Sequence, residues 1–136
     1  MSKMFSVYTD GASRGNPGRA SIGVMIQDKD GQALQTLSEY LGIATNNEAE
    51  YTALIRGLEA VARFNPDRID FYLDSQLVVR QMTGEYKIKN KNMQVLAKKV
   101  KTLCDNIRPA TVHFHHIPRE KNKEADRLAN EALDAR

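Results

Sequence analysis

With 136 residues, the chain is long enough for one domain with a hydrophobic core and too short for two. Hydrophobic residues make up 41% of it, which excludes a disordered chain, and the net charge of +3 permits a nucleic-acid partner without requiring one. The single cysteine excludes an internal disulfide, and no apolar run is long enough for a membrane span, so we expect a cytoplasmic protein with one domain, residues 1–136.

Three β-strands are predicted in the first third of the chain. Met4–Thr9 alternates β-branched and aromatic residues with others, and Ala20–Gln27 and Ala33–Leu41 have a similar character. Gly11–Arg19, which contains three glycines and a proline, and Asp28–Gly31 are predicted as the connecting turns. These short connections favour an antiparallel meander of the three strands.

Helices dominate the rest of the chain. Apolar residues at helical spacing predict a helix over Asn47–Phe64, which begins with a capping box formed by Thr45 and Glu48. The later elements are a strand at Ile69–Leu73, a helix at Ser75–Met82, a helix from Met93 to Ile107, a strand at Thr111–His116 and a helix at Lys121–Leu133. The order βββαβααβα predicts an α/β fold, a five-stranded mixed sheet with helices on its faces.

Two aspartates lie where two of these strands end. Asp10 comes directly after the first predicted strand and Asp74 directly after the fourth, each two residues after a tyrosine. If the two strands are parallel neighbours, both carboxylates emerge at the edge where open α/β sheets place their sites. Each aspartate alone would also suit a turn or a helix cap.

Two further carboxylates are predicted on the core-facing stripes of helices. Glu50 lies four residues before Leu54, and Asp126 lies three residues before Ala129. A buried carboxylate is destabilising unless a charged group satisfies it, and four clustered carboxylates repel each other. Mg²⁺ prefers oxygen ligands and relieves such repulsion, and two ions can stabilise the attacking and leaving oxygens of a phosphodiester.

Four blocks of sequence resemble those of the type 1 ribonuclease H family. They are Tyr-Thr-Asp-Gly-Ala-Ser-Arg-Gly-Asn-Pro-Gly (8–18), Thr-Asn-Asn-Glu-Ala-Glu (45–50), Asp-Ser-Gln (74–76) and Asn-Lys-Glu-Ala-Asp-Arg-Leu-Ala (122–129). The blocks follow the family's order and cover nearly the whole chain. The resemblance implies the ribonuclease H-like fold, and it implies catalytic, metal-binding roles for Asp10, Glu50, Asp74 and Asp126.

The resemblance also implies an activity. We expect an endonuclease that hydrolyses the RNA strand of RNA–DNA hybrids by a two-metal mechanism, giving 3′-hydroxyl and 5′-phosphate ends. The expected cofactor is two Mg²⁺ ions, for which Mn²⁺ can substitute. Asp10 is expected to bridge them, Glu50 and Asp74 to hold the first and Asp126 to complete the second. The expected partner is the hybrid duplex, with no membrane and no obligate protein partner, and the expected state is a monomer.

Four polar residues are implied to contact the substrate. Asn16, Asn46 and Gln76 correspond to family residues that reach the minor groove of the hybrid, where RNA displays its 2′-hydroxyls. Thr45 corresponds to a residue near a phosphate of the DNA strand. Without the resemblance, local roles would be favoured: a turn for Asn16, a helix cap for Thr45 and an exposed surface position for Gln76.

The chain departs from the family in its basic surface. Many members carry a basic, tryptophan-containing protrusion after the short helix. This chain has no tryptophan, and the short stretch Gly84–Asn92 offers only Lys87, Lys89 and Lys91. We expect no separate hybrid-binding module, and therefore either a weaker affinity for the hybrid or the use of other surfaces.

The loop before Asp126 is a second departure. Many members place there a mobile histidine that is thought to assist product release. Here His116 is expected to end a strand, which makes Arg119 the better-placed mobile cation. A guanidinium cannot act as a base near neutral pH, so we expect Arg119 to act electrostatically in turnover and not in metal binding. His116 in this role is the alternative.

Three other functions remain open from the sequence. An integrase, transposase or junction resolvase would share the fold but lack the full set of blocks. A non-catalytic nucleic-acid-binding module is disfavoured, because a binder would gain affinity by losing carboxylates from its contact surface. Cleavage of double-stranded RNA is also open, because that duplex shares the A-form shape.

Overall fold

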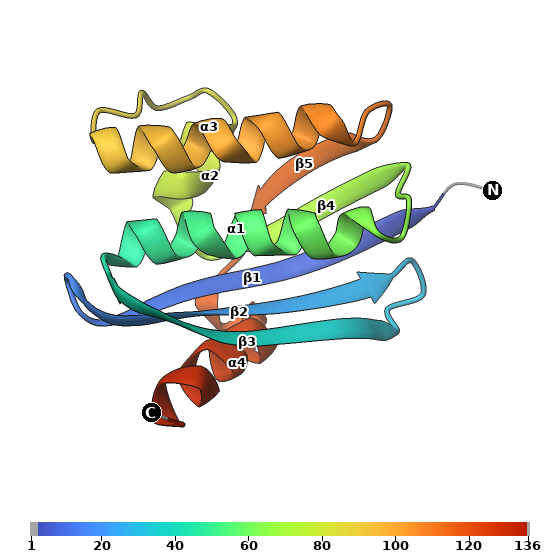
Figure 1. The fold of residues 1–136 in the computed structure, drawn as a ribbon. Coiled ribbons are helices and arrows are strands. Elements are labelled where there is room, and N and C mark those ends of the chain that lie inside the picture. Colours follow the sequence, from blue (N-terminus) through green and yellow to red (C-terminus); the bar gives the residue numbers. More distant parts are fainter. Residues whose placement is uncertain (1–2, 136) are drawn as a thin grey trace.

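A computed structural model describes residues 3–135 as one mixed sheet with helices on both faces (Figure 1). The elements in chain order are β1 (Met4–Gly15), β2 (Gly18–Asp28), β3 (Ala33–Ala44), α1 (Asn46–Ala62), β4 (Arg68–Leu73), α2 (Gln76–Met82), α3 (Lys91–Asn106), β5 (Thr111–His116), a 3₁₀ turn (Arg119–Lys121) and α4 (Lys123–Asp134). The predicted fold class and order of elements are confirmed.

The strands are arranged in the order β3-β2-β1-β4-β5. β1 and β3 both pair with β2 in antiparallel fashion, which confirms the predicted meander. β4 pairs with β1 and with β5 in parallel fashion. Because β1 and β4 are parallel neighbours, the residues at their carboxyl ends emerge at one edge of the sheet, as the sequence predicted for Asp10 and Asp74.

The first turn is shorter than predicted. Gly11–Arg19 was expected to be a turn, but the β1–β2 ladder continues until Gly15 lies opposite Gly18. Only Asn16 and Pro17 form the turn. Pairing with β2 satisfies the backbone groups of this glycine-containing segment, which by local composition alone looks like a loop. Asp10 therefore lies within β1 and not after it.

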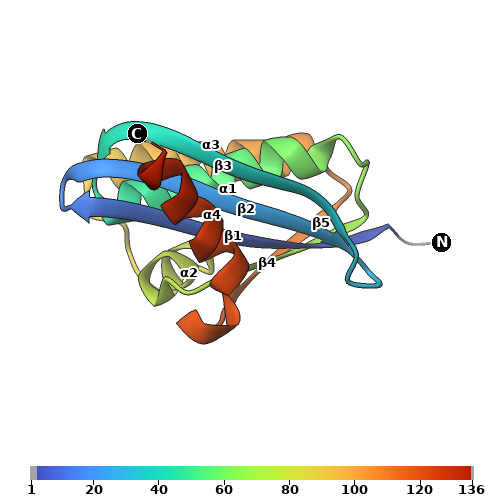
Figure 2. The same ribbon diagram turned by 90° about the horizontal axis from the view of Figure 1, so that it is seen from below.

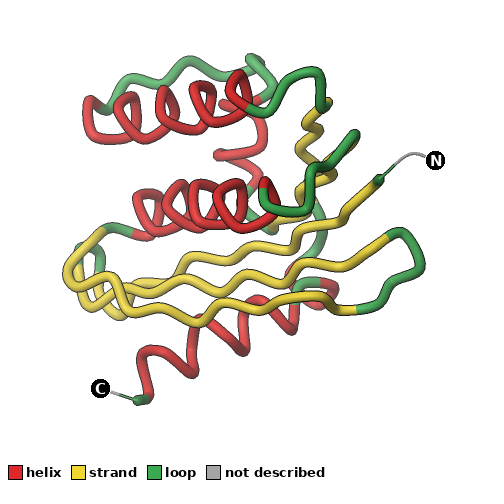
Figure 3. Tube along the Cα trace, turned by 45° about the vertical axis from the view of Figure 1, so that its right-hand side comes forward, coloured by secondary structure: helices red, strands yellow, loops and turns green. Residues whose placement is uncertain are grey.

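The helices form two layers of unequal size. α1 and α3 lie side by side over one face of the sheet, with α2 between them and β5, whereas α4 lies alone on the other face (Figures 1 and 3). The main core fills the space between α1, α3 and the sheet. Its largest fully buried side chains include Tyr51, Phe71, Ile22, Ile26, Leu54, Leu58 and Ile69.

α4 packs against the sheet through its own backbone. A Cβ atom on Gly23 of β2 would lie 2.0 Å from a carbonyl oxygen of α4, so only glycine allows this approach. The Ser21 hydroxyl donates to the carbonyl oxygen of Ala129 at 2.5 Å, and the Ser38 hydroxyl donates to that of Leu128 at 2.6 Å. Figure 2 shows α4 lying across β1, β2 and β3 as a result.

The boundaries of all four predicted helices are shifted by one or two residues. α1 begins one residue earlier than predicted and ends at Ala62, and Asn65, with a φ of 52°, follows it in the left-handed region. α4 begins at Lys123 and not at Lys121, because Arg119–Lys121 form a separate 3₁₀ turn. Among the helices that the structure describes, none is long and apolar enough to cross a membrane.

Candidate active site

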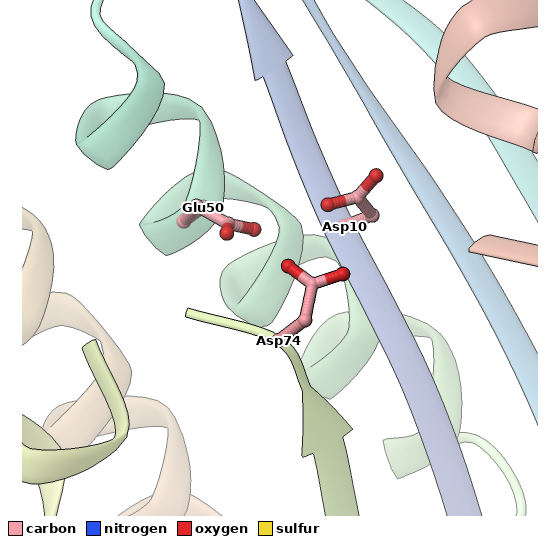
Figure 4. A group of neighbouring side chains, drawn as sticks. All are labelled: Asp10, Glu50 and Asp74. Atoms are coloured by element: carbon pink, nitrogen blue, oxygen red, sulfur yellow. The ribbon is translucent and has the colours of Figure 1, made fainter. Parts of the chain in front are cut away.

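Three carboxylates from three elements meet at the carboxyl edge of the parallel strands (Figure 4). Asp10 comes from β1, Glu50 from α1 and Asp74 from the residue after β4. One oxygen of each lies within 4.8 Å of the others. Asp10 and Glu50 are buried, at 6% and 8% exposure, and Asp74 is half-buried. The predicted meeting of these side chains is confirmed.

Glu50 reaches the cluster because α1 approaches β1 closely. The Gly11 N–H donates to Glu50 Oε1 at 2.7 Å. A Cβ atom on Gly11 would lie 2.2 Å from the carbonyl carbon of Ala49, so any other residue would push α1 away. The start of α1 is fixed by Thr45 and Glu48, which form both hydrogen bonds of the predicted capping box.

Asp126 lies beside this cluster in the first turn of α4. It lies close enough to Asp10 to raise the pKa of that carboxyl group. Its side chain is 33% exposed, so Asp126 is half-buried, whereas Ala129 and Leu133 of the predicted core-facing stripe are buried. The reason is that Asp126 lines the open cleft of the site, whereas its neighbour Ala125 packs on Gly23 of β2. Arg119 Nη2 lies 3.8 Å from Asp126 Oδ1, and the Arg119 side chain is 81% exposed.

The cluster holds more negative charge than its surroundings compensate. Burial, followed by the charges of Asp74 and Asp126, raises the pKa of Asp10 to about 8, although Arg119 lowers it. Burial and the charge of Asp10 hold the pKa of Glu50 well above its usual value, against the hydrogen bond from Gly11. An all-oxygen donor set that lacks positive charge fits hard divalent cations such as Mg²⁺.

The cluster lies in a cleft of about 520 Å³ whose lining contains all four carboxylates, Arg119 and Asn46. Asn16 accepts the Asn46 N–H through Oδ1 at 3.1 Å, so these two predicted substrate residues lie together at one end. Thr45 precedes Asn46 and has the cap role described above. Gln76 is the exposed first residue of α2 and is not among the lining residues.

The histidines of β5 lie outside this cleft. His115 Nε2 pairs with Asp70 Oδ1 at 2.7 Å, and its ring stacks on Tyr72, so it is a strand-face residue as predicted. His116 ends β5, as expected, and does not line the cleft, whereas Arg119 does. A larger hollow of about 650 Å³ between α3 and β5 is bordered by His113 and contains none of the predicted site residues.

Two asparagines near the site were not singled out from the sequence. Asn122 is 1% exposed, and its Nδ2 donates to the carbonyl oxygen of Thr9 at 2.9 Å and to Asp74 Oδ2 at 3.3 Å. Asn130 lines the cleft, and its Nδ2 donates to the carbonyl oxygen of Asp126 at 3.0 Å. The only local signal was the position of Asn122 before a helix, which suggests an ordinary N-cap.

Glu48 is close to the site in sequence but serves the helix cap, so Glu48→Gln is expected to be mild. Glu48 Oε1 accepts the Thr45 N–H at 2.8 Å, and the amide oxygen of glutamine can do the same. Turnover should stay within about twofold of the wild type, whereas Glu48→Ala should cost about 1 kcal/mol of stability. Thermal unfolding and steady-state cleavage rates measure both. A glutamine variant that is folded but inactive would place Glu48 in the chemistry.

The chain is similar in sequence and in fold to several known proteins. Residues 8–132 match a family described as "Reverse transcriptase-like". The chain is 42% identical over 127 residues to the protein named Ribonuclease HI of Halobacterium salinarum, and the match covers 93% of this chain. It is 32% identical to the Ribonuclease H of Chlorobium phaeobacteroides, and that match covers 98% of this chain and 97% of the relative.

A solved structure supports the same relationship. The crystal structure of LC11-RNase H1 in complex with an RNA/DNA hybrid superposes with a TM-score of 0.91 at 45% identity, covering 96% of this chain and 97% of that one. Some relatives are longer. The chain spans 63% of the Halobacterium protein and 35% of each of three mycobacterial relatives.

Proposed function

Because the chain belongs to the type 1 ribonuclease H family, we propose that it is an endonuclease that hydrolyses the RNA strand of RNA–DNA hybrid duplexes. The observation that carries this proposal is the cluster of Asp10, Glu50 and Asp74, whose oxygens lie within 4.8 Å of one another. The complex of the similar LC11 protein with an RNA/DNA hybrid supports the choice of substrate.

Divalent cations, with Mg²⁺ as the proposed ion, fit between these carboxylates. Asp10 interacts with Asp74, Asp126 and Glu50, so it would contact both ions. Glu50 and Asp74 would hold one of them, and Asp126 would complete the site of the other. When bound, two such ions would stabilise the attacking and leaving oxygens of the phosphodiester. The products proposed are a 3′-hydroxyl and a 5′-phosphate.

The residues around the carboxylates have complementary tasks. The Gly11 N–H holds one oxygen of Glu50 and leaves the other oxygen free to bind a cation. Asn16 accepts a bond from the Asn46 backbone through Oδ1, which leaves its NH₂ group to donate to a ribose hydroxyl in the minor groove. Thr45 accepts a bond from the backbone of α1, and its hydroxyl proton remains available for a DNA phosphate.

Cleavage of end-labelled substrates tests the proposal. A hybrid, a double-stranded RNA and a double-stranded DNA of matched sequence should be compared with Mg²⁺ and with chelator. The expected result is Mg²⁺-dependent cutting of the RNA strand of the hybrid, with 3′-hydroxyl and 5′-phosphate ends and an intact DNA duplex. Products that bear a 3′-phosphate or a cyclic phosphate, or cutting of the DNA duplex, would contradict it.

Arg119 is proposed to act in turnover, because it is an exposed cation that lines the cleft beside Asp126, whereas Arg14, which also lines the cleft, is paired with Asp134. Arg119→Ala is expected to lower kcat by roughly 10- to 1000-fold, as for other groups that stabilise developing charge. Its distance of 3.8 Å from Asp126 and its exposure make the ion pair weak, so Mg²⁺ affinity should barely change. Steady-state rates and Mg²⁺ titrations measure the two effects.

His116→Ala is the matched control for this prediction. His116 is exposed, ends β5 and does not line the cleft, so its removal should cost far less turnover. If His116→Ala is the crippling change and Arg119→Ala is silent, the histidine has the role assigned to Arg119.

A further inference from the structure

Asn122 occupies the N-cap position of α4, but its side chain does not cap the helix. An asparagine at such a position usually accepts an N–H of the first turn through Oδ1. Here the side chain makes no cap bond, and Oδ1 is buried without a hydrogen-bond partner among the described residues. Asn90, at the start of α3, shows the usual arrangement, since its Oδ1 accepts the Met93 N–H at 3.0 Å. Other contacts therefore decide how the Asn122 side chain lies.

Those contacts connect Asn122 to three of the four carboxylates. Its Nδ2 donates to Asp74 Oδ2 at 3.3 Å and to the carbonyl oxygen of Thr9, the residue before Asp10, at 2.9 Å. Its own carbonyl oxygen accepts the Asp126 N–H at 3.1 Å. Asn122 is thus hydrogen-bonded to the side chain of Asp74, to the peptide group that precedes Asp10 and to the backbone of Asp126.

The sheet does not hold Asp74 in place by itself. The last residue pair of the β1–β4 ladder is Tyr8 with Tyr72, and Asp74 follows β4. Beyond this pair, Asp10 and Asp74 repel each other, as the effect of Asp74 on the pKa of Asp10 indicates. A neutral amide donor can hold both strands without bringing a positive charge that would compete with a cation.

We propose that Asn122 is a positioning residue that fixes Asp74 and the start of α4 relative to Asp10, so that the carboxylates are spaced for divalent cations before a cation binds. The lost cap bond and the unpaired Oδ1 destabilise the fold, and such local conflicts are expected where a residue serves a site. This inference deepens the proposed function. It rests on that function only in the assumption that the bound cations serve RNA cleavage.

Mg²⁺ binding to the whole protein, measured by calorimetry without nucleic acid, tests the proposal. Asn122→Leu keeps a similar shape but removes both the donor and the unpaired acceptor. It is expected to weaken Mg²⁺ binding by about 10- to 100-fold, as for other groups that orient metal ligands. The Mg²⁺ concentration for half-maximal cleavage should rise by the same factor, and kcat at saturating Mg²⁺ should largely recover.

Asn90→Leu is the matched control, since it removes a functioning cap far from the carboxylates. It should lower the Tm and leave Mg²⁺ affinity unchanged. A folded Asn122→Leu protein that binds Mg²⁺ as tightly as the wild type overturns the proposal. If that variant does not fold, NMR of the ¹⁵N-labelled wild type decides. The side-chain amide signals of Asn122 should shift during an Mg²⁺ titration while those of Asn90 stay, and unshifted Asn122 signals overturn it.

The two proposals fail in different ways. Weakened Mg²⁺ binding by Asn122→Leu, together with a wild type that does not cut the hybrid, would reject the proposed function and support the positioning role. Hybrid cleavage by the wild type, together with unchanged Mg²⁺ binding by Asn122→Leu, would support the proposed function and reject the positioning role.

Discussion

Asp10→Asn is expected to abolish measurable hydrolysis of the hybrid and to yield a folded protein that is more stable than the wild type without divalent cations. Asp10 interacts electrostatically with each of the other three carboxylates, so its charge is the one that both proposed cations need. The same charge is buried beside Asp74 and Asp126 when no cation is bound, which destabilises the folded state. Asparagine keeps the shape and removes the charge.

The gain in stability should depend on pH. The pKa of Asp10 rises from 3.8 to about 8, mainly through burial and then through Asp74 and Asp126. Between these two values the folded protein holds a proton that the unfolded chain has released, so the stability contributed by this group falls as pH rises. The Tm of Asp10→Asn should therefore exceed that of the wild type more at pH 8 than at pH 5, as measured by thermal unfolding with chelator.

Asp105→Asn provides the control for a lost carboxylate. Asp105 lies on α3, where it is exposed and paired with Arg108 at 3.3 Å. Its replacement should change neither turnover nor the pH dependence of the Tm. Near-normal turnover by folded Asp10→Asn would show that the chemistry lies elsewhere.

Gly11→Ala is expected to damage both the fold and the site, although it adds only one methyl group. The new Cβ atom would meet the backbone at Ala49 and Glu50, at 2.2 and 2.3 Å, and backbone cannot rotate away as a flexible side chain can. β1 and α1 must separate by more than an ångström, which removes the 2.7 Å bond to Glu50 and displaces its carboxylate. Overpacking costs about 1–3 kcal/mol of stability, and a displacement of 1 Å costs about 100-fold in rate, so we expect a lower Tm and about a 100-fold loss of kcat/KM.

Gly31→Asn is the control for Gly11→Ala. It replaces a glycine at a position where a new Cβ atom meets no other atoms. Gly31 lies in the β2–β3 turn with a φ of 83° and with open space around its Cα atom. Asparagine tolerates this conformation, so stability should fall slightly and kcat/KM should not change. If Gly11→Ala retains wild-type kcat/KM, the close approach of α1 is not what positions Glu50.

Elements whose boundaries depend on residues close by in the sequence were predictable from the sequence. Thr45 and Glu48 stand at the spacing of a capping box and form both of its bonds. The alternation in Thr111–His116 marks β5 with its observed bounds. The shared edge of Asp10 and Asp74 was predicted on the condition that β1 and β4 are parallel neighbours, and the structure meets that condition.

Features that depend on distant partners were not predictable in the same way. The segment after Asp10 looks like a turn by composition, and only pairing with β2 makes it a strand. The helical stripe predicted burial for Asp126, but the stripe does not reveal that this residue lines an open cleft and stays half-buried. Asn122 and Thr9 are 113 positions apart, so no local pattern indicates their hydrogen bond.

The docking of α4 through Gly23, Ser21 and Ser38 has a consequence for the order of events during translation. The ribosome makes Asp10, Glu50 and Asp74 well before Asp126, and domains fold from their N-terminal parts as these emerge. Asp126 joins the other carboxylates only once α4 has left the exit tunnel and settled on β2 and β3. Under the proposed roles, a nascent chain whose α4 is still inside the exit tunnel has an incomplete set of cation ligands and cannot yet cut RNA.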